Sequence, residues 1–361
     1  MVRVLQVVTK MDRGGLETML MNYYRHIDRD KVQFDFLTHR KERGAYDTEI
    51  EEMGGGIYHL PRLVPWSLSY KHALNQFFIE HPEYRIVHVH QDCLSSIILK
   101  VAAQHGVPVR IAHSHSSSQD KNLKYLIKMF YKRQIPQYAT ELFACSVNAG
   151  EWMFGTQNIH VLPNAIDIRQ YTFNTSVRAD MRKKLGVGKE LVIGHVGRFS
   201  KVKNQSFLVD VFEQVKQQEP KSKLLLVGGG EELETIQHKC NSLGLDQDVI
   251  FTGVRNDVAA LMQAMDIFIF PSLYEGVPVT LLEAQASGLP CIISDRVPGD
   301  CIVTTLVQQI SLKESIAIWA SKAIIAAKYP RKDTRKEISI AGFDIYQAAK
   351  NLEQYYELKM R

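Results

Sequence analysis

Two glutamates in one short segment could act together on a sugar. Glu275 and Glu283 stand eight residues apart, after an apolar run at 267–270 that predicts a strand. Pro278 between them suits the first turn of a helix, so Glu275 would lie on a loop and Glu283 one to two turns inside the helix. Free N–H groups at a helix start can hold a phosphate, and both carboxylates would border that anion and could accept hydrogen bonds from sugar hydroxyls. The segment therefore predicts a nucleotide-sugar pocket; the alternative is an ordinary strand–loop–helix with surface acids.

Positive charge follows another predicted strand, at 191–196. Arg198 and Lys203 are the residue types that suit a departing diphosphate, because arginine offers a planar fork and lysine a point charge. Together they would stabilise the leaving group electrostatically. Lys201 lies between them and is expected to face solvent.

Glycines follow the first predicted strand, at 4–8. Gly14 and Gly15 would let the backbone approach a ligand closely and expose N–H groups at a helix start. Their spacing is not G-x-G-x-x-G, so a nicotinamide site is poorly supported. The alternative is a plain strand–helix turn.

Two histidines end the predicted strand at 109–112, where the strand ends of an open sheet face the ligand crevice. We expect His115 in the active site, with His113 as its rival. No nearby carboxylate or cysteine completes a metal site around this pair. Two Asp-x-Asp segments, 28–30 and 246–248, are expected to be solvated turns, so we predict no metal and no cofactor.

The motifs around the two glutamates resemble the E-x7-E motif of retaining glycosyltransferases of family 4 (group 1), which have the two-domain GT-B fold. Pro-Ser-x-x-Glu-Gly-x-Pro and Glu-Ala-x-Ala-x-Gly-x-Pro carry the resemblance. It implies that Glu275 approaches the transferred sugar and Glu283 holds the ribose. It also implies that Gly15, Arg198 and Lys203 face the donor diphosphate.

The resemblance adds a loop that contacts the base, with Val254 or Arg255 as the contact. The remaining candidate site residues contribute loop backbone and are Gly14, Gly276, Val277, Thr280 and Leu281. The segments Arg-Ile-Ala-His-Ser-His and Cys-Ile-Ile-Ser-Asp are most similar to bacterial capsular or exopolysaccharide members of the family.

Short apolar runs alternate with helical segments along the whole chain, which indicates α/β architecture with parallel sheets covered on both faces. Two such series predict two Rossmann-like, doubly wound domains, and the resemblance places them across a cleft. The expected N-terminal, acceptor-side domain comprises residues 1–170. The expected C-terminal, nucleotide-sugar domain comprises residues 171–344, and a final helix at 345–361 returns to the first domain.

Composition limits the classes of protein to which the chain can belong. Its 361 residues exceed what one hydrophobic core usually holds, and no apolar run reaches the ~20 residues needed to span a bilayer. A net charge of +5 is mild for this length and does not point to nucleic acid. Five scattered cysteines fit a reduced cytosol. We therefore expect a cytoplasmic protein.

One basic segment, 121–133, suggests contact with the inner face of the membrane. Its lysines recur at helical spacing, and Leu123, Leu126, Ile127 and Phe130 can form a second face. Such a helix can lie on an anionic membrane. The alternative is a solvated helix whose apolar face packs on the N-terminal sheet.

Taken together, these features predict transfer of a sugar from a nucleoside-diphosphate sugar to a saccharide or lipid-linked saccharide. The resemblance implies a UDP-sugar as the donor and retention of configuration. The alternatives are a sugar-nucleotide 2-epimerase or a phosphorylase on the same fold, or a sugar-nucleotide-binding protein without activity. An epimerase would need acid–base residues around C2 of the sugar, and no extra carboxylate cluster marks such a site.

Overall fold

The computed structural model describes residues 1–116, 125–155 and 157–360. Contacts within the chain divide it into two compact units. The first unit is Met1–Ala165 with Ile345–Arg361, and the second is Ile166–Asp344. Residues 166–170, assigned to the first domain from the sequence, belong to the second unit because Ile166 bridges to Asp344.

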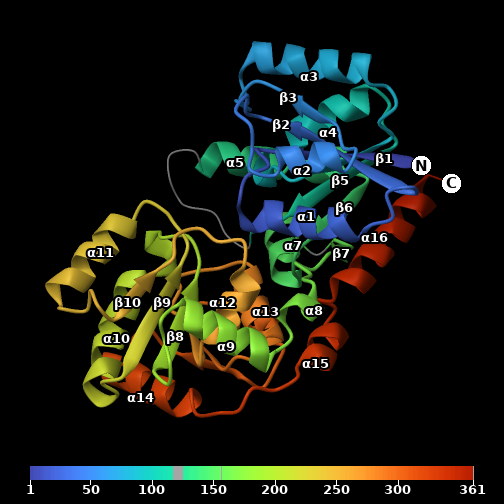
Figure 1. Ribbon diagram of the computed structural model, residues 1–361. Helices are drawn as coiled ribbons and strands as arrows, with labels where there is room; N and C mark the ends of the chain where they lie inside the picture. The colour runs from blue at the N-terminus through green and yellow to red at the C-terminus, as the bar shows by residue number, and fades with distance from the viewer. Residues whose placement is uncertain (117–124, 156, 361) are drawn as a thin grey trace. The chain divides into compact units, whose positions relative to one another are not determined.

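Within the described residues, the first unit has a parallel sheet of seven strands in the order β3-β2-β1-β4-β5-β6-β7 (Figure 1). The strands are β1 (Val2–Val8), β2 (Val32–Thr38), β3 (Ile57–His59), β4 (Ile86–Val89), β5 (Val109–Ser114), β6 (Glu141–Ala144) and β7 (His160–Val161).

Helices cover both faces of this sheet. They are α1 (Gly15–His26), α2 (Asp47–Glu52), α3 (Leu68–Glu80), α4 (Ser95–Gln104), α5 (Tyr125–Lys132), α6 (Ile135–Tyr138), α7 (Val147–Phe154) and α16 (Ile345–Lys359), with a 3₁₀ turn η1 (Asp92–Leu94). Because side chains alternate along a strand, each strand contributes to two cores. One core lies under α1 and α16, and the other lies under α3 and α4.

The second unit repeats the plan. Within the described residues its parallel sheet has six strands in the order β10-β9-β8-β11-β12-β13. The strands are β8 (Leu191–Val196), β9 (Ser222–Val227), β10 (Val249–Phe251), β11 (Ile267–Phe270), β12 (Cys291–Ser294) and β13 (Val307–Ile310).

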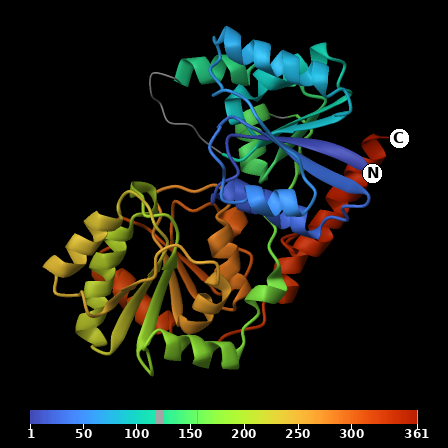
Figure 2. The same ribbon diagram turned by 45° about the horizontal axis from the view of Figure 1, so that its top comes forward.

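Both views show helices on either face of this second sheet (Figures 1 and 2). The helices are α8 (Ile168–Tyr171), α9 (Thr175–Lys184), α10 (Gln205–Gln218), α11 (Leu233–Ser242), α12 (Val258–Ala264), α13 (Val279–Ala286), α14 (Ile316–Ala326) and α15 (Arg335–Ile340), with 3₁₀ turns η2 (Lys201–Lys203) and η3 (Gly299–Cys301). Residues of α10, α11 and α14 form one core with the strands, while α12 and α13 pack on the other face.

Three strands that the sequence did not indicate complete the sheets. β3 and β7 are only 3 and 2 residues long and lie at the two edges of the first sheet. β13, Val-Gln-Gln-Ile, is the edge strand of the second sheet and exposes its two central glutamines. β7 and β13 bury little apolar surface and carry no apolar run, whereas β10, the other edge strand of the second sheet, is the apolar run Val-Ile-Phe.

In the part of the chain that the structure describes, no helix combines the length and the apolar character that crossing a membrane requires.

The C-terminal helix α16 belongs to the core of the first unit and lies beside α1 (Figure 1). Its buried apolar face includes Leu352 and Tyr356. Glu353 holds the helix to the turn before β2, because its carboxylate accepts from the Asp28 N–H at 3.1 Å and from Lys31 Nζ at 2.9 Å. The last residues of the chain therefore complete the first domain.

This packing makes a prediction about Leu352, whose side chain is 4% exposed. Leu352→Ala should lower the free energy of unfolding of the first unit by about 2–5 kcal/mol, the usual range for emptying a leucine site in a core. Hydrogen exchange of peptides, read by mass spectrometry, should show lost protection in the first unit alone. Leu358→Ala is the matched control, since Leu358 lies on the same helix and is 65% exposed. Equal loss of protection in both units would contradict this packing.

Candidate functional site

The order of the strands reverses once in each sheet, between β1 and β4 and between β8 and β11. Ligands of open parallel sheets bind outside the carboxyl ends of the strands at such a point, because the loops there turn to opposite faces. The residues that follow these four strands include Gly14 and Gly15, His90, Arg198 with Lys203, and Glu275. Both switch points thus carry candidate site residues.

Lys203 and Glu275 meet at the switch point of the second sheet. Lys203 Nζ donates to Glu275 Oε1 at 2.6 Å, and the two side chains are 20% and 11% exposed. The ammonium group also lies 4.8 Å from the ring centre of Phe270, the last residue of β11. A half-buried charge pair is therefore held where the strands end.

Arg198 follows β8 but points elsewhere. Its guanidinium pairs with Glu231 at 2.9 Å and is 73% exposed. Two residues that bind one diphosphate would be expected to point toward a common position. Arg198 and Lys203 instead pair with different carboxylates in the structure. Lys201, in the turn between them, is exposed, as expected.

A glycine loop after β9 packs directly on the backbone around Arg198. Gly228 and Gly230 have φ angles of 140° and 150°, which side chains rarely adopt. A Cβ on Gly228 would lie 2.1 Å from the carbonyl oxygen of Gly197, and one on Gly230 would lie 2.3 Å from that of Phe199. The glycines therefore allow two loops to touch at the carboxyl edge of the sheet.

The segment that carries the two glutamates has the expected form of strand, loop and helix. α13 begins at Val279, with Pro278 as its N-cap, so the proline stands just before the first helical turn. Glu275 lies on the loop and Glu283 in the second turn of the helix.

Glu283 is a buried carboxyl, 8% exposed. The Tyr171 hydroxyl donates to its Oε1 at 2.7 Å. Burial raises the pKa of Glu283 to about 7, although the bond from Tyr171 works in the opposite direction. Tyr171 was not expected at the site, because its segment reads as an irregular polar connection.

The other candidates in this segment offer backbone rather than side chains. Val277 and Leu281 are buried, Leu281 completely. The Cys301 thiol contacts the carbonyl oxygen of Gly276 at 3.6 Å. Thr280 lies in the first turn of α13, where the backbone N–H groups have no partner within the helix.

The loop expected to contact the base is exposed. Val254 is 58% exposed, and Arg255 pairs with Asp257 at 2.7 Å. Gly253 carries this loop through a φ of 68° and accepts a hydrogen bond from the Gly228 N–H. The loop therefore adjoins the glycine loop.

In the first unit, α1 begins at Gly15, with Gly14 as its N-cap. A Cβ on Gly15 would meet nothing within 4 Å, so the helix start opens to free space. Gly14 has no side chain to cap this start, and the Glu17 carboxylate lies over it, 2.3 Å from where a Cβ of Gly14 would be.

The two candidate histidines occupy different environments. His113 is 1% exposed inside β5, whereas His115 lies just past the strand and is half-buried. Burial lowers the pKa of His115 to about 3, so the ring is neutral at pH 7. The structure thus places His115 nearer to the sheet edge than its rival.

Two further histidines, which the sequence analysis missed, join them: His88 lies in β4 and His90 directly follows it. His88 Nε2 lies 3.0 Å from His113 Nδ1, and His90 Nδ1 lies 2.8 Å from His115 Nε2. His88-x-His90 has the same spacing as His113-x-His115 and ends the neighbouring strand, which was the available signal. His88, His90 and His113 each bring a ring nitrogen within 4.8 Å of the others, so these three rings are close enough to be weighed as a candidate metal site.

Both Asp-x-Asp segments lie in turns. Asp28 pairs with Lys31 at 3.2 Å. Asp248 pairs with Lys216 at 2.8 Å and with Lys223 at 2.9 Å. Lysines thus already pair with one carboxylate of each segment.

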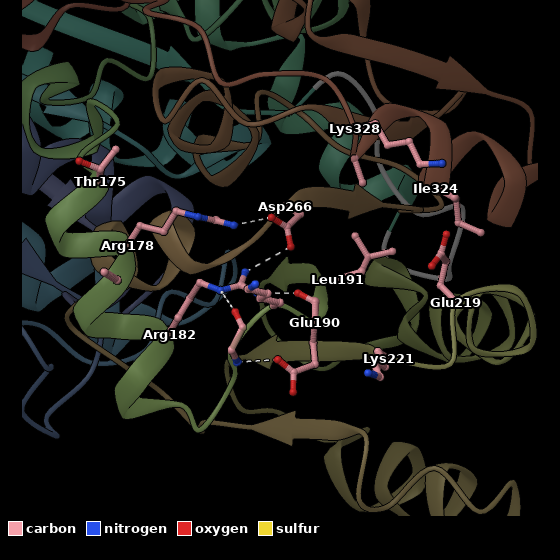
Figure 3. Close-up of a pocket in the computed structure, with 14 residues that line it drawn as sticks. Thr175, Arg178, Arg182, Glu190, Leu191, Glu219, Lys221, Asp266, Ile324 and Lys328 are labelled. Carbon is pink, nitrogen blue, oxygen red and sulfur yellow. Dashed lines mark hydrogen bonds and ion pairs between the residues drawn. The ribbon is translucent and has the colours of Figure 1, made fainter.

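A cavity of about 710 Å³ lies at the opposite edge of the second sheet, between α9 and the starts of β8 and β11 (Figure 3). Arg178 and Arg182 point across it to Asp266, at 2.5 and 3.2 Å. Their other N–H groups donate to backbone carbonyls at 263–265 and 188–190. These arginines fasten α9 to the sheet, and among the described residues no candidate site residue lines the cavity.

Comparison with known proteins agrees with this arrangement. The family model "Glycosyltransferase Family 4" matches residues 13–170, and "Glycosyl transferases group 1" matches residues 177–326. The Bacillus subtilis (strain 168) protein EpsF, itself assigned to the glycosyltransferases, is 37% identical over 370 residues, which cover 99% of this chain and 96% of EpsF. The chain belongs to the group 1, family 4 glycosyltransferases.

Other relatives of this glycosyltransferase also match it over nearly its whole length. The Staphylococcus aureus capsular polysaccharide biosynthesis glycosyltransferase CapH is 24% identical over 99% of both chains. Among solved structures, Anabaena Alr3699/HepE in complex with UDP and glucose aligns with a TM-score of 0.82 at 18% identity, covering 99% of this chain and 100% of HepE. The two parallel sheets with their alternating helices confirm the expected two-domain GT-B fold.

The buried carboxyl of this glycosyltransferase makes stability depend on pH. Between pH 4.5 and about 7 the folded chain keeps a proton on Glu283 that the unfolded chain has released, so wild-type stability falls as pH rises through this window. Glu283→Gln has no such proton, and its stability relative to wild type should rise across the window by up to about 3 kcal/mol.

Denaturant unfolding of the second unit, followed by hydrogen exchange of its peptides from pH 4.5 to 8, measures this difference. Glu234→Gln, an exposed glutamate on α11, controls for loss of a carboxyl group. A Glu283→Gln difference that stays constant with pH would show that the carboxyl ionises like a surface group.

Proposed function

We propose that this glycosyltransferase moves a sugar from a UDP-sugar to a saccharide or lipid-linked saccharide acceptor in capsular or exopolysaccharide synthesis, with retention of configuration. The observation that carries the proposal is the Lys203–Glu275 pair at the switch point of the second sheet. Glu283 lies in the helix that follows Glu275 and is the second carboxyl of the proposed site.

The Lys203–Glu275 ion pair would stabilise the site before the donor binds. Without a ligand, each half-buried charge neutralises the other at 2.6 Å. A diphosphate brings more negative charge than one carboxylate, so it would draw Lys203 toward itself and free Glu275 to accept hydrogen bonds from the transferred sugar. Lys203 would then stabilise the departing diphosphate as the glycosidic bond of the donor breaks.

Arg198 would bind the diphosphate after its ion pair with Glu231 breaks. The Arg198–Glu231 pair is largely exposed, and exposed pairs contribute little stability, so the exchange costs little. The start of α13 adds backbone N–H groups for the same anion. On this proposal the two cations replace the charge that a metal ion supplies in other transferases, and the enzyme needs no metal.

Glu283 would hold the ribose of the nucleotide. Ribose hydroxyls that donate to the carboxylate favour its ionised form, as the Tyr171 hydroxyl already does. The HepE structures bound to UDP share this fold and support UDP as the nucleotide. In the first unit, His115 would face the transferred sugar, and the open helix start at Gly15 would face the donor phosphate.

The test of this function is transfer from UDP-sugars to oligosaccharide and lipid-linked acceptors. Lys203→Ala should lower turnover by at least about a hundredfold, the scale for losing one preorganised charge. Lys201→Ala, which removes an exposed lysine from the same 3₁₀ turn, should leave turnover within about twofold. Equal activity of the two variants would remove Lys203 from the donor site.

Three arms of the same assay test the finer parts of the proposal. EDTA should leave the rate unchanged, and a rate lost with EDTA and restored by manganese would contradict metal independence. Proton NMR of the first-formed product should show the donor's anomeric configuration. Donor without acceptor should not be epimerised, which separates the transferase from a 2-epimerase.

We further propose that α5 docks the enzyme on the inner face of the membrane, where a lipid-linked acceptor would lie. Leu126 and Phe130 are 78% and 62% exposed and one turn apart. In the alternative this apolar face packs on the sheet, but Met129 and Tyr131 are the residues of α5 that pack against the core. Lys132 Nζ lies 4.2 Å from the ring centre of Trp152. Two of the basic residues, Lys121 and Lys124, and the apolar Leu123 lie outside the described residues.

Sedimentation with liposomes tests this docking. Binding to anionic vesicles should weaken with salt, because each basic residue near the surface adds about 1 kcal/mol. The double variant Leu126→Ser and Phe130→Ser should reduce binding at least about tenfold, since it removes the apolar anchor. Leu68→Ser, on α3 and 79% exposed, is the control. Equal binding to neutral and anionic vesicles, or none to either, would exclude the proposal.

A further inference from the structure

A single hydrogen-bonded network of polar side chains lies in the first unit, on the sheet face that α16 covers. Its members, in chain order, are Gln6, His88, His90, His113, His115 and Tyr356. All except half-buried His115 are at most 4% exposed. These side chains come together because their strands are neighbours in the sheet. Gln6 on β1 pairs in register with His88 on β4, and β4 pairs with β5, which carries His113.

The four imidazole rings are neutral. Burial lowers the pKa of His88, His90 and His113 well below the usual range, and neighbouring rings lower it further. A neutral ring has one N–H donor and one nitrogen acceptor. Once the proton in one bond of the network is placed, the tautomer of each following ring is therefore determined.

Tyr356 places the first proton. Its hydroxyl lies 2.7 Å from His88 Nδ1 and 3.5 Å from the Gln6 side-chain amide. A phenol is a stronger acid than a neutral imidazole N–H, and imidazole nitrogen is the better acceptor. The short bond is therefore O–H to nitrogen, in which Tyr356 donates to His88. His88 then donates from Nε2 to His113 Nδ1 at 3.0 Å.

The same proton orients the Gln6 amide. The Tyr356 hydroxyl donates its only hydrogen to His88, so toward Gln6 its oxygen can only accept. Gln6 must therefore turn its NH₂ group toward that oxygen and its carbonyl oxygen toward His90. His90 Nε2, at 2.9 Å, then donates to Gln6 Oε1. This leaves His90 Nδ1 as the acceptor in the 2.8 Å bond from His115 Nε2.

We propose that Tyr356, acting through Gln6 and His90, is a positioning residue that holds His115 in the tautomer with Nε2 protonated and Nδ1 as an acceptor. An acceptor nitrogen at the edge of the sheet suits a hydroxyl group of a sugar substrate. The effect on turnover rests on the proposed function, in which His115 faces the transferred sugar; the tautomer itself does not.

A metal ion held by His88, His90 and His113 is the competing use of these rings. Metal ligands direct in-plane lone pairs at one point. Here the His88 ring is stacked on those of His90 and His113 at interplanar angles of 22° and 21°. Five of the six nitrogens of these three rings already have partners, and the sixth, His113 Nε2, has none in the described part of the chain. A metal would have to break these bonds, and the hydrogen-bond network is the better account.

The tautomers can be read directly. In protein labelled with ¹⁵N at histidine, without substrate at pH 7, two-bond ¹H–¹⁵N correlations distinguish Nε2–H from Nδ1–H, and loss of signals in His115→Asn assigns His115. The wild type should show His115 as the single Nε2–H tautomer. An Nδ1–H ring at His115 in the wild type would overturn the proposal without any variant.

Two variants separate the branches of the network. Tyr356→Phe removes the first proton, so His115 should become a mixture of tautomers. Gln6→Leu should disturb His115 but leave His88 and His113 as Nε2–H rings, because their branch does not pass through Gln6. Tyr355→Phe, the neighbouring tyrosine on α16, should leave all four rings unchanged.

Turnover gives the second readout. Tyr356→Phe should lower kcat about tenfold or more, the scale of losing an outer partner of a functional ring, with little change in KM for the UDP-sugar. An unchanged His115 spectrum in this variant, or stoichiometric zinc uptake that removes the ring N–H signals, would overturn the proposal. Wild-type turnover in His115→Asn would instead contradict the active-site role of His115 and leave the tautomer assignment standing.

Discussion

Parallel pairing of every strand is the constraint on which both units depend. Because neighbouring strands run the same way, all carboxyl ends of a sheet meet at one edge. Because the strand order reverses once, two adjacent loops at that edge separate and leave room for a ligand. Lys203 and Glu275 come from those two loops in the second unit, and Gly15 and His90 come from them in the first.

Burial then gives similar side chains different charges. Glu275 stays beside an ammonium group at the sheet edge, whereas Glu283 is buried with a tyrosine as its partner and its pKa rises to about 7. One carboxyl is thus suited to a charged pair and the other to a site where a ligand's hydroxyls favour ionisation. The histidines follow the same rule, since burial keeps their rings neutral and lets them form a directed chain of hydrogen bonds.

The framework around these sites is mostly backbone. Gly228 and Gly230 let two loops touch where any Cβ would collide with a carbonyl oxygen. Arg178 and Arg182 fasten α9 to the far edge of the second sheet through backbone carbonyls. The carboxyl edge is fastened in the same way, because the Asn204 side chain donates to the Pro271 carbonyl oxygen at 3.1 Å and the Gln205 side chain donates to that of Arg198 at 2.9 Å.

Local sequence was enough to locate the central strands and the loops that carry Glu275 and Arg198. β8 and β11 begin and end where apolar runs predicted, because a central parallel strand is buried on both faces and is therefore mostly apolar. Edge strands such as β7 and β13 bury less and leave no such run, and the irregular-looking segment at 171 supplied a partner for Glu283.

Contacts between residues far apart in the chain were decided only by the tertiary structure. Tyr171 and Glu283 are separated by 112 positions, and His88 and Tyr356 by 268. The sequence by itself determined the two α/β domains, the family motifs and the residue types at the strand ends. Which of those residues meet, which are buried and which proton each ring carries depend on packing between distant segments, because hydrogen bonding and desolvation act through space and leave no periodic pattern along the chain.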